Sequence, residues 1–129
     1  MHAASFIRRR EIVLETELLA KPELPLITVH EIFHFVWARL GNPARNSYAL
    51  LLQEELRVKA RGELGESSMV KKDAALSDTR DYVCESFCDT AAWLYAPGSK
   101  RWPVTLAKRW RERRTAWFES TFGGLSRAC

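Results

Sequence analysis

Two of the three histidines in the chain lie four residues apart, at the ends of the motif HEIFH that runs from His30 to His34. On a helix, side chains at this spacing lie on one face, so both imidazoles can reach a single metal ion. Glu31 follows the first histidine and, with histidine taken as neutral, is the only charged residue between Thr28 and Val36. Chance placement on an ordinary amphipathic helix is the alternative, and it is disfavoured because histidine is scarce in ordinary compositions. The motif therefore predicts a metal-binding helix with a carboxylate beside the metal.

Zinc is the metal that this motif favours, and its chemistry gives Glu31 a role. A zinc ion held by three protein ligands keeps a fourth position for water and lowers the pKa of that water to about 7. Glu31 is then expected to act as a general base that takes a proton from the water and later delivers it to a leaving amine. Hydrolysis of a peptide bond is the reaction that the motif predicts.

A third protein ligand is required, and two carboxylates later in the chain are the best candidates. Glu85 and Asp89 are four residues apart in a predicted helix, so they share a face and can supply a ligand and its support together. The remaining histidine, His2, is a poor candidate because the first residues of most domains are loosely held. Trp37 and Leu40 stand where metzincins carry a glycine and a third histidine, which excludes that family.

Cys88 lies between the two carboxylates and is a competing ligand, because a thiolate also binds zinc. The more common role of a free cysteine is that of a small buried hydrophobic residue, and this role is favoured here. Cys84 and Cys88 are also poorly placed for a disulfide on one helix, so reduced thiols are expected.

The two motifs together resemble the gluzincins, whose second motif is a glutamate followed four residues later by an aspartate. The resemblance implies that His30, His34 and Glu85 are the zinc ligands. It also implies that Asp89 accepts a hydrogen bond from the imidazole N–H of one of the histidines and fixes its tautomer. The stretch ESFCDTAAWLYAP, which begins at Glu85, is similar to the ImmA/IrrE branch. The order of strand, His-Glu helix and Glu helix resembles a minigluzincin core over residues 8 to 97.

The sequence departs from the gluzincin pattern at two points. The interval between His34 and Glu85 is long enough for a whole additional helix and loop. No histidine or tyrosine is marked as the donor to a transition-state oxyanion, although Tyr82 and Arg80 lie about one turn from Glu85 and are candidates. A protein that lacks such a donor would be a slow enzyme or a protein without turnover.

The remaining sequence predicts a mainly helical α+β fold with a zincin-like core. Alternating apolar and charged residues predict a strand over residues 8 to 19, and prolines at 22 and 25 interrupt regular structure after it. Glycine or proline is expected to end the helices that follow. These helices are expected over residues 26 to 40, 42 to 59, 78 to 97 and 104 to 122, with a short one near residues 70 to 76.

Length and composition favour one globular domain that covers residues 1 to 129. The chain is 47% hydrophobic and 28% charged, with a net charge of +4. Its apolar runs are far shorter than the roughly 20 residues that cross a bilayer, so no membrane partner is expected. Arginines near the start are followed by Glu11 rather than by an apolar stretch, so we expect a cytoplasmic protein.

The C-terminal segment combines arginines with tryptophans and permits a second interpretation of function. Arg109, Arg113 and neighbouring basic residues could contact nucleic-acid phosphates while Trp110 stacks on bases. A core stripe of aromatic residues with arginines on the solvent side is the favoured interpretation. The expected function is thus a zinc peptidase with a peptide or protein substrate. The alternative is a weakly active or inactive regulatory module that binds nucleic acid or protein through this helix.

Overall fold

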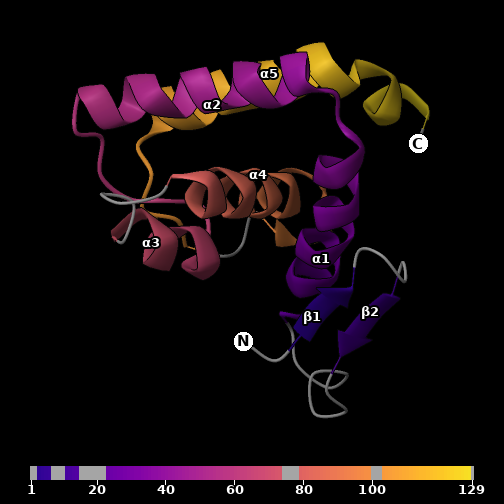
Figure 1. The fold of residues 1–129 in the computed structure, drawn as a ribbon. Helices are drawn as coiled ribbons and strands as arrows, with labels where there is room; N and C mark the ends of the chain where they lie inside the picture. Colours follow the sequence, from indigo (N-terminus) through magenta and orange to yellow (C-terminus); the bar gives the residue numbers. More distant parts are fainter. Residues whose placement is uncertain (1–2, 7–10, 15–22, 74–78, 100–102, 129) are drawn as a thin grey trace.

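The computed structural model describes residues 3–6, 11–14, 23–73, 79–99 and 103–128, and these form a mainly helical structure. Helix α4 lies at its centre and packs against α1 and α3, while α2 and α5 run side by side across it (Figure 1). The elements are β1 (Ala3–Phe6), β2 (Glu11–Leu14), α1 (Leu24–Arg39), α2 (Asn42–Arg57), α3 (Glu66–Asp73), α4 (Arg80–Tyr95) and α5 (Lys108–Ala128).

Proline and extended residues define the ends of the helices that carry the motifs. Pro25 lies in the first turn of α1, where its missing N–H would have no helical partner. The helix ends at Arg39 because Leu40 is extended, and Pro43 begins α2 in the same way. Helix α4 ends where Ala96 becomes extended, directly before Pro97. The predicted breaks therefore lie within a few residues of the observed ones.

Helix α4 is buried on most of its circumference, which fixes the position of every side chain that it carries. Nine of its residues are buried, and Phe87 is 0% exposed. The Phe87 ring lies 4.9 Å from Trp37 of α1, 5.7 Å from Tyr48 of α2 and 5.2 Å from Phe118 of α5, measured between ring centres. A central aromatic cluster thus joins four helices around the segment that contains Glu85.

A short antiparallel hairpin precedes the helices. Strand β1 pairs with β2 in a register that places Ala3 opposite Leu14 and Phe6 opposite Glu11, and β1 packs against α1. The strand predicted for residues 8 to 19 overlaps β2 over Glu11–Leu14, and its residues 7–10 and 15–22 lie outside the described residues. The first strand of the hairpin was not predicted.

Two helix predictions are wrong in their boundaries. Helix α3 begins at Glu66, four residues before the predicted short helix, and residues 74–78 lie outside the described residues. Helix α5 begins at Lys108 rather than at Val104, because Thr105 donates its backbone N–H to the carbonyl of Glu63 (3.2 Å). It also continues past the predicted stop at Gly123, with a non-helical residue at Phe122 (φ −122°, ψ 23°). Within the described ranges, no helix has the length and apolar character needed to cross a membrane.

Candidate metal centre

Three side chains from α1 and α4 converge at one point. The Nε2 atoms of His30 and His34 lie 3.3 Å apart on α1. Glu85 of α4 contacts both imidazoles, with Oε2 3.0 Å from Nε2 of His30 and Oε1 3.4 Å from Nε2 of His34. The structure therefore brings together the three residues that the sequence assigns as ligands, although they are separated by up to 55 positions in the chain (85 − 30).

The spacing of these atoms is close to that of neighbouring ligands in a tetrahedral zinc site. Zinc binds imidazole nitrogen and carboxylate oxygen at about 2.0 to 2.2 Å, and tetrahedral angles then place neighbouring ligand atoms about 3.3 to 3.6 Å apart. The two Nε2 atoms are 3.3 Å apart, and each faces a different oxygen of Glu85, at 3.0 Å for His30 and 3.4 Å for His34. With one of these oxygens as the third ligand, a tetrahedral site keeps a fourth position for water or substrate.

One oxygen of Glu85 carries a further sign of a cation site. Oε2 is fully buried, and no donor among the described residues reaches it with hydrogen-bond geometry, although His30 Nε2 is only 3.0 Å away. A buried carboxylate oxygen without a well-aligned donor is costly, and here the nearby His30 imidazole offsets that cost only by its charge. A cation between Glu85 and the two imidazoles would bind this oxygen directly, and two imidazoles with one carboxylate are a donor set that fits zinc.

The charges of the three groups are strongly coupled. Burial alone lowers the pKa of His30, but its contacts with Asp89 and Glu85 outweigh burial and raise the pKa to about 9. Burial likewise lowers the pKa of His34, whereas contacts with Cys84 and Glu85 raise it to about 10. Burial raises the pKa of Glu85, and the two imidazoles reverse this and lower it to about 2. The carboxylate is therefore ionised, as a metal ligand must be.

Asp89 lies behind His30, on the side opposite Glu85. Its Oδ1 is 2.7 Å from Nδ1 of His30, and its Oδ2 accepts the backbone N–H of Ser68 at 2.8 Å. A histidine whose Nδ1–H is held by a carboxylate presents the lone pair of Nε2 to a metal. This contact has the geometry that the gluzincin resemblance implies for Asp89. The second imidazole contacts a thiol instead, with Sγ of Cys84 3.6 Å from Nδ1 of His34.

Cys88 offers a second ligand set. Its Sγ and one nitrogen of each of His30 and His34 all lie within 4.8 Å of one another. The thiol is 0% exposed, however, and burial raises its pKa well above the ordinary value, which disfavours the thiolate. Glu85 is closer to both imidazoles and already ionised, so its carboxylate is the better third ligand.

Glu31 follows His30 on α1, and the residue is buried, with an exposed fraction of 1%. The side chains of His34 and Glu85 are 20% and 15% exposed, whereas those of His30 and Asp89 are 6% and 9% exposed. Solvent therefore reaches the site from the side of His34 and Glu85. The side that contains Asp89 is closed.

Of the two proposed oxyanion donors, Tyr82 lies in a separate buried cluster and Arg80 lies at the surface. Tyr82 is 0% exposed, and its hydroxyl donates to Oε2 of Glu63 in a separate polar cluster. Burial, followed by the Glu63 charge, raises the pKa of Tyr82 far above its usual range. A hydroxyl held in this way is not directed to a substrate oxygen, and this position disfavours Tyr82 as the oxyanion donor. Arg80 is exposed in the first turn of α4.

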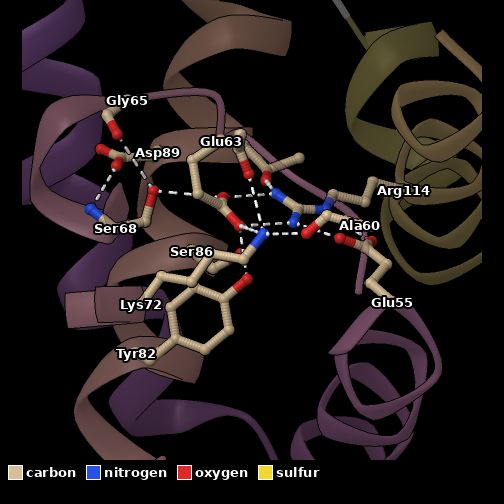
Figure 2. A network of polar contacts seen from close by, with 12 residues as sticks. Glu55, Ala60, Glu63, Gly65, Ser68, Lys72, Tyr82, Ser86, Asp89 and Arg114 are labelled. Carbon is tan, nitrogen blue, oxygen red and sulfur yellow. Dashed lines mark hydrogen bonds and ion pairs between the residues drawn. The ribbon is translucent and has the colours of Figure 1, made fainter. Parts of the chain in front are cut away.

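A buried ionic cluster lies next to the site and was missed by the sequence analysis (Figure 2). Arg114 of α5 is 0% exposed and binds Glu55 at 2.6 and 2.9 Å and Glu63 at 2.8 Å through two nitrogens. The expectation that the arginines of this helix lie on the solvent side is wrong for this residue. The spacing contains a signal for it, since Arg114 lies four residues after Trp110 and four before Phe118, both of which are buried.

Comparison of the chain with known protein families, with curated proteins and with solved structures gives no match in any of the three. Function must therefore be inferred from the geometry and chemistry of the site.

Proposed function

We propose that this protein is a zinc-dependent metallopeptidase with a zincin-like core. One observation carries the proposal. The Nε2 atoms of His30 and His34 lie 3.3 Å apart and within 3.0 to 3.4 Å of the Glu85 carboxylate, and one buried oxygen of Glu85 accepts no hydrogen bond from the described residues. Such a site with three protein ligands and an opening to solvent is typical of catalytic rather than structural zinc.

Each residue has a defined task in this proposal. When bound, zinc would supply a water of pKa about 7 and polarise the substrate carbonyl. His30, His34 and Glu85 hold the ion, and Asp89 keeps the proton of His30 on Nδ1. Glu31 accepts a proton from the attacking water and delivers it to the leaving amine. Its burial keeps this carboxylate away from competing bulk water.

A peptide is the substrate class that the surrounding backbone fits. Strand β1 packs against α1, which carries both histidines, and β1 and β2 form a two-stranded sheet. Within the described ranges, each strand has a paired neighbour on one side only. A peptide in extended form can add to such an edge as a further strand, through main-chain hydrogen bonds.

Substitution Glu31→Gln tests the assignment of the general base. The variant keeps the size of the side chain and all three proposed ligands, so it should bind zinc as the wild type does. Hydrolysis of a mixed peptide library, followed by mass spectrometry, should fall by about 100-fold to 10,000-fold. Zinc retention together with unchanged cleavage would exclude Glu31 as the base.

A zincin-like module without turnover is the second candidate, and the position of Tyr82 favours it. Because its hydroxyl is bound to Glu63, the site lacks the oxyanion donor proposed from the sequence. Wild-type protein that binds zinc and cleaves no peptide of the library would support this candidate. A nucleic-acid partner is less favoured, since Trp110 is only 5% exposed and packs with Leu64 and Leu106. Failure to bind DNA or RNA at low salt would exclude it.

A further inference from the structure

The buried cluster around Arg114 connects α5 to the loop between α2 and α3, which packs against Asp89. Arg114 lies on α5, Glu55 lies near the end of α2, and Glu63 lies in the segment between α2 and α3. Lys72 of α3 adds a second positive charge, with Nζ 3.7 Å from Oε2 of Glu63. With Arg114 and Lys72 opposite Glu55 and Glu63, two positive charges balance two negative ones. The cluster is electrically neutral.

The same cluster holds the backbone of the segment in place. Lys72 donates to the carbonyl oxygens of Ala60 and Gly62, at 2.9 Å each. Glu63 accepts a hydrogen bond from the hydroxyl of Ser68 at 3.2 Å. The segment from residue 60 to residue 68 is therefore fixed at its start and at its end by charged side chains.

This segment forms the wall against which the Asp89 carboxylate rests (Figure 2). The backbone N–H of Ser68 donates to Oδ2 of Asp89 at 2.8 Å. Gly65 passes so close that a Cβ there would lie 2.3 Å from Cγ and 2.4 Å from Oδ2 of Asp89. Real Cβ atoms do not approach other atoms this closely, so any other residue at this position would have to displace the carboxylate. The orientation of Asp89 is thus set by the segment on one side and by His30 on the other.

Stability alone does not account for such a cluster. Removing two carboxylates and two cations from water costs free energy that their attraction returns only with good geometry, and apolar replacements are often as stable. The cluster does hold three helices and a loop in one fixed arrangement. Because this loop contacts Asp89, the cluster can fix the orientation of the Asp89 carboxylate.

We infer that Glu63 is a positioning residue of the metal site, which acts through Ser68 and Asp89 on the imidazole of His30. Arg114 holds Glu63 in place from α5, and Gly65 allows the loop to reach the carboxylate. This inference rests on the proposed zinc site. It adds a third layer behind the zinc ligands, since Asp89 supports His30 and the loop supports Asp89.

A double-mutant cycle on zinc affinity tests the inference. Asp89→Asn should weaken zinc binding by about 10-fold to 100-fold, as expected for a carboxylate that supports a histidine ligand. Glu63→Gln keeps the shape of the side chain and should weaken binding by about 10-fold. In the Asp89→Asn background, however, Glu63→Gln should change the affinity by less than about twofold, because the two residues act in series. Competition with a chromophoric chelator measures all four proteins.

A matched control tests whether the loss of any carboxylate, rather than of Glu63 in particular, weakens zinc binding. Glu54→Gln removes a carboxylate on α2 that pairs with Arg57 at the surface, and it should leave zinc affinity unchanged. The ¹⁵N shifts of the His30 ring in the zinc-loaded proteins give a second readout. Glu63→Gln should alter the Nδ1 signal, whereas Glu54→Gln should not.

Each outcome decides the question. Additive effects of Glu63→Gln and Asp89→Asn would overturn the inference and leave the zinc site intact. Wild-type protein that binds no zinc would overturn the proposed function as well as the inference. If Glu63→Gln does not fold, Gly65→Ala replaces it in the cycle, since its Cβ acts directly on the Asp89 carboxylate. An unchanged zinc affinity in Gly65→Ala would then contradict the inference that the loop positions Asp89.

Discussion

At the scale of single residues, the two imidazoles carry protons that a metal must displace. The pKa of His30 is raised to about 9 and that of His34 to about 10 by the neighbouring carboxylates and thiol, in spite of burial. The raised pKa values favour protonated rings at neutral pH in the metal-free protein, beside an ionised Glu85. A histidine ligand has to be neutral, so metal binding releases these protons.

Zinc affinity is therefore expected to rise steeply with pH. Between pH 6 and pH 8, both below the raised pKa values, binding should release up to two protons and strengthen by up to about 100-fold per pH unit. The metal-free protein has the opposite dependence, because a pKa raised on folding stabilises the fold fully below the ordinary value of 6.5. That contribution is lost as the pH rises through about 9 to 10. The two opposite trends come from the same pair of histidines.

Chelator competition at pH 6, 7 and 8 measures the first trend, and urea unfolding of the chelator-treated protein from pH 6 to 10 measures the second. In the urea series, His34→Ala serves as control, since it should reduce the pH dependence of unfolding toward that of one imidazole. A zinc affinity that does not change with pH would contradict the raised pKa values of the two histidines.

At the scale of elements, α4 is the scaffold of the site because its burial leaves it no freedom to rotate. Phe87 is 0% exposed and contacts aromatic rings of α1, α2 and α5. Phe87→Ala should lower the free energy of unfolding by about 3 to 5 kcal/mol, through lost burial and the cavity that remains. Chemical denaturation followed by tryptophan fluorescence measures this change.

The matched surface substitution is Leu50→Ala on α2, where the side chain is 64% exposed. It should alter the free energy of unfolding by less than about 0.5 kcal/mol. Equal effects of the two substitutions would show that α4 is not the centre of the core.

Local sequence signals predicted the elements that carry the site better than those around it. Helix α1 is marked by Pro25 and by the extended Leu40 before Gly41, and α4 by Pro97, so both could be located within a few residues. The start of α3 at Glu66 could not, because no proline marks it in the sequence.

The sequence could predict only those groups of site residues that lie at helical spacing on one helix. The motif from His30 to His34 and the pair Glu85 and Asp89 are local patterns, and each lies on one helix. The contact of Arg114 with Glu63 joins residues 51 positions apart, and nothing in the local sequence distinguishes this arginine's partner. Pairings of this kind follow from the packing of whole helices.

At the scale of the whole molecule, the proposed zinc site and the Arg114 cluster lie at opposite ends of one chain of contacts. His30 of α1 contacts Asp89 of α4, and the loop that covers Asp89 is bound by Arg114 of α5. Figure 1 shows α4 beneath α5 and beside α1, the helices that carry these two ends. The mainly helical fold was predicted, and this long-range connection was not.

If His30, His34 and Glu85 hold one zinc ion, the zinc content of the purified protein shows it. Protein reconstituted with zinc, passed through a desalting column and measured by elemental analysis should contain one zinc per chain. Cys88→Ala should contain the same amount, whereas Glu85→Ala and the double variant His30→Ala, His34→Ala should contain almost none. Wild-type protein without zinc, or variants that retain it in full, would contradict the account.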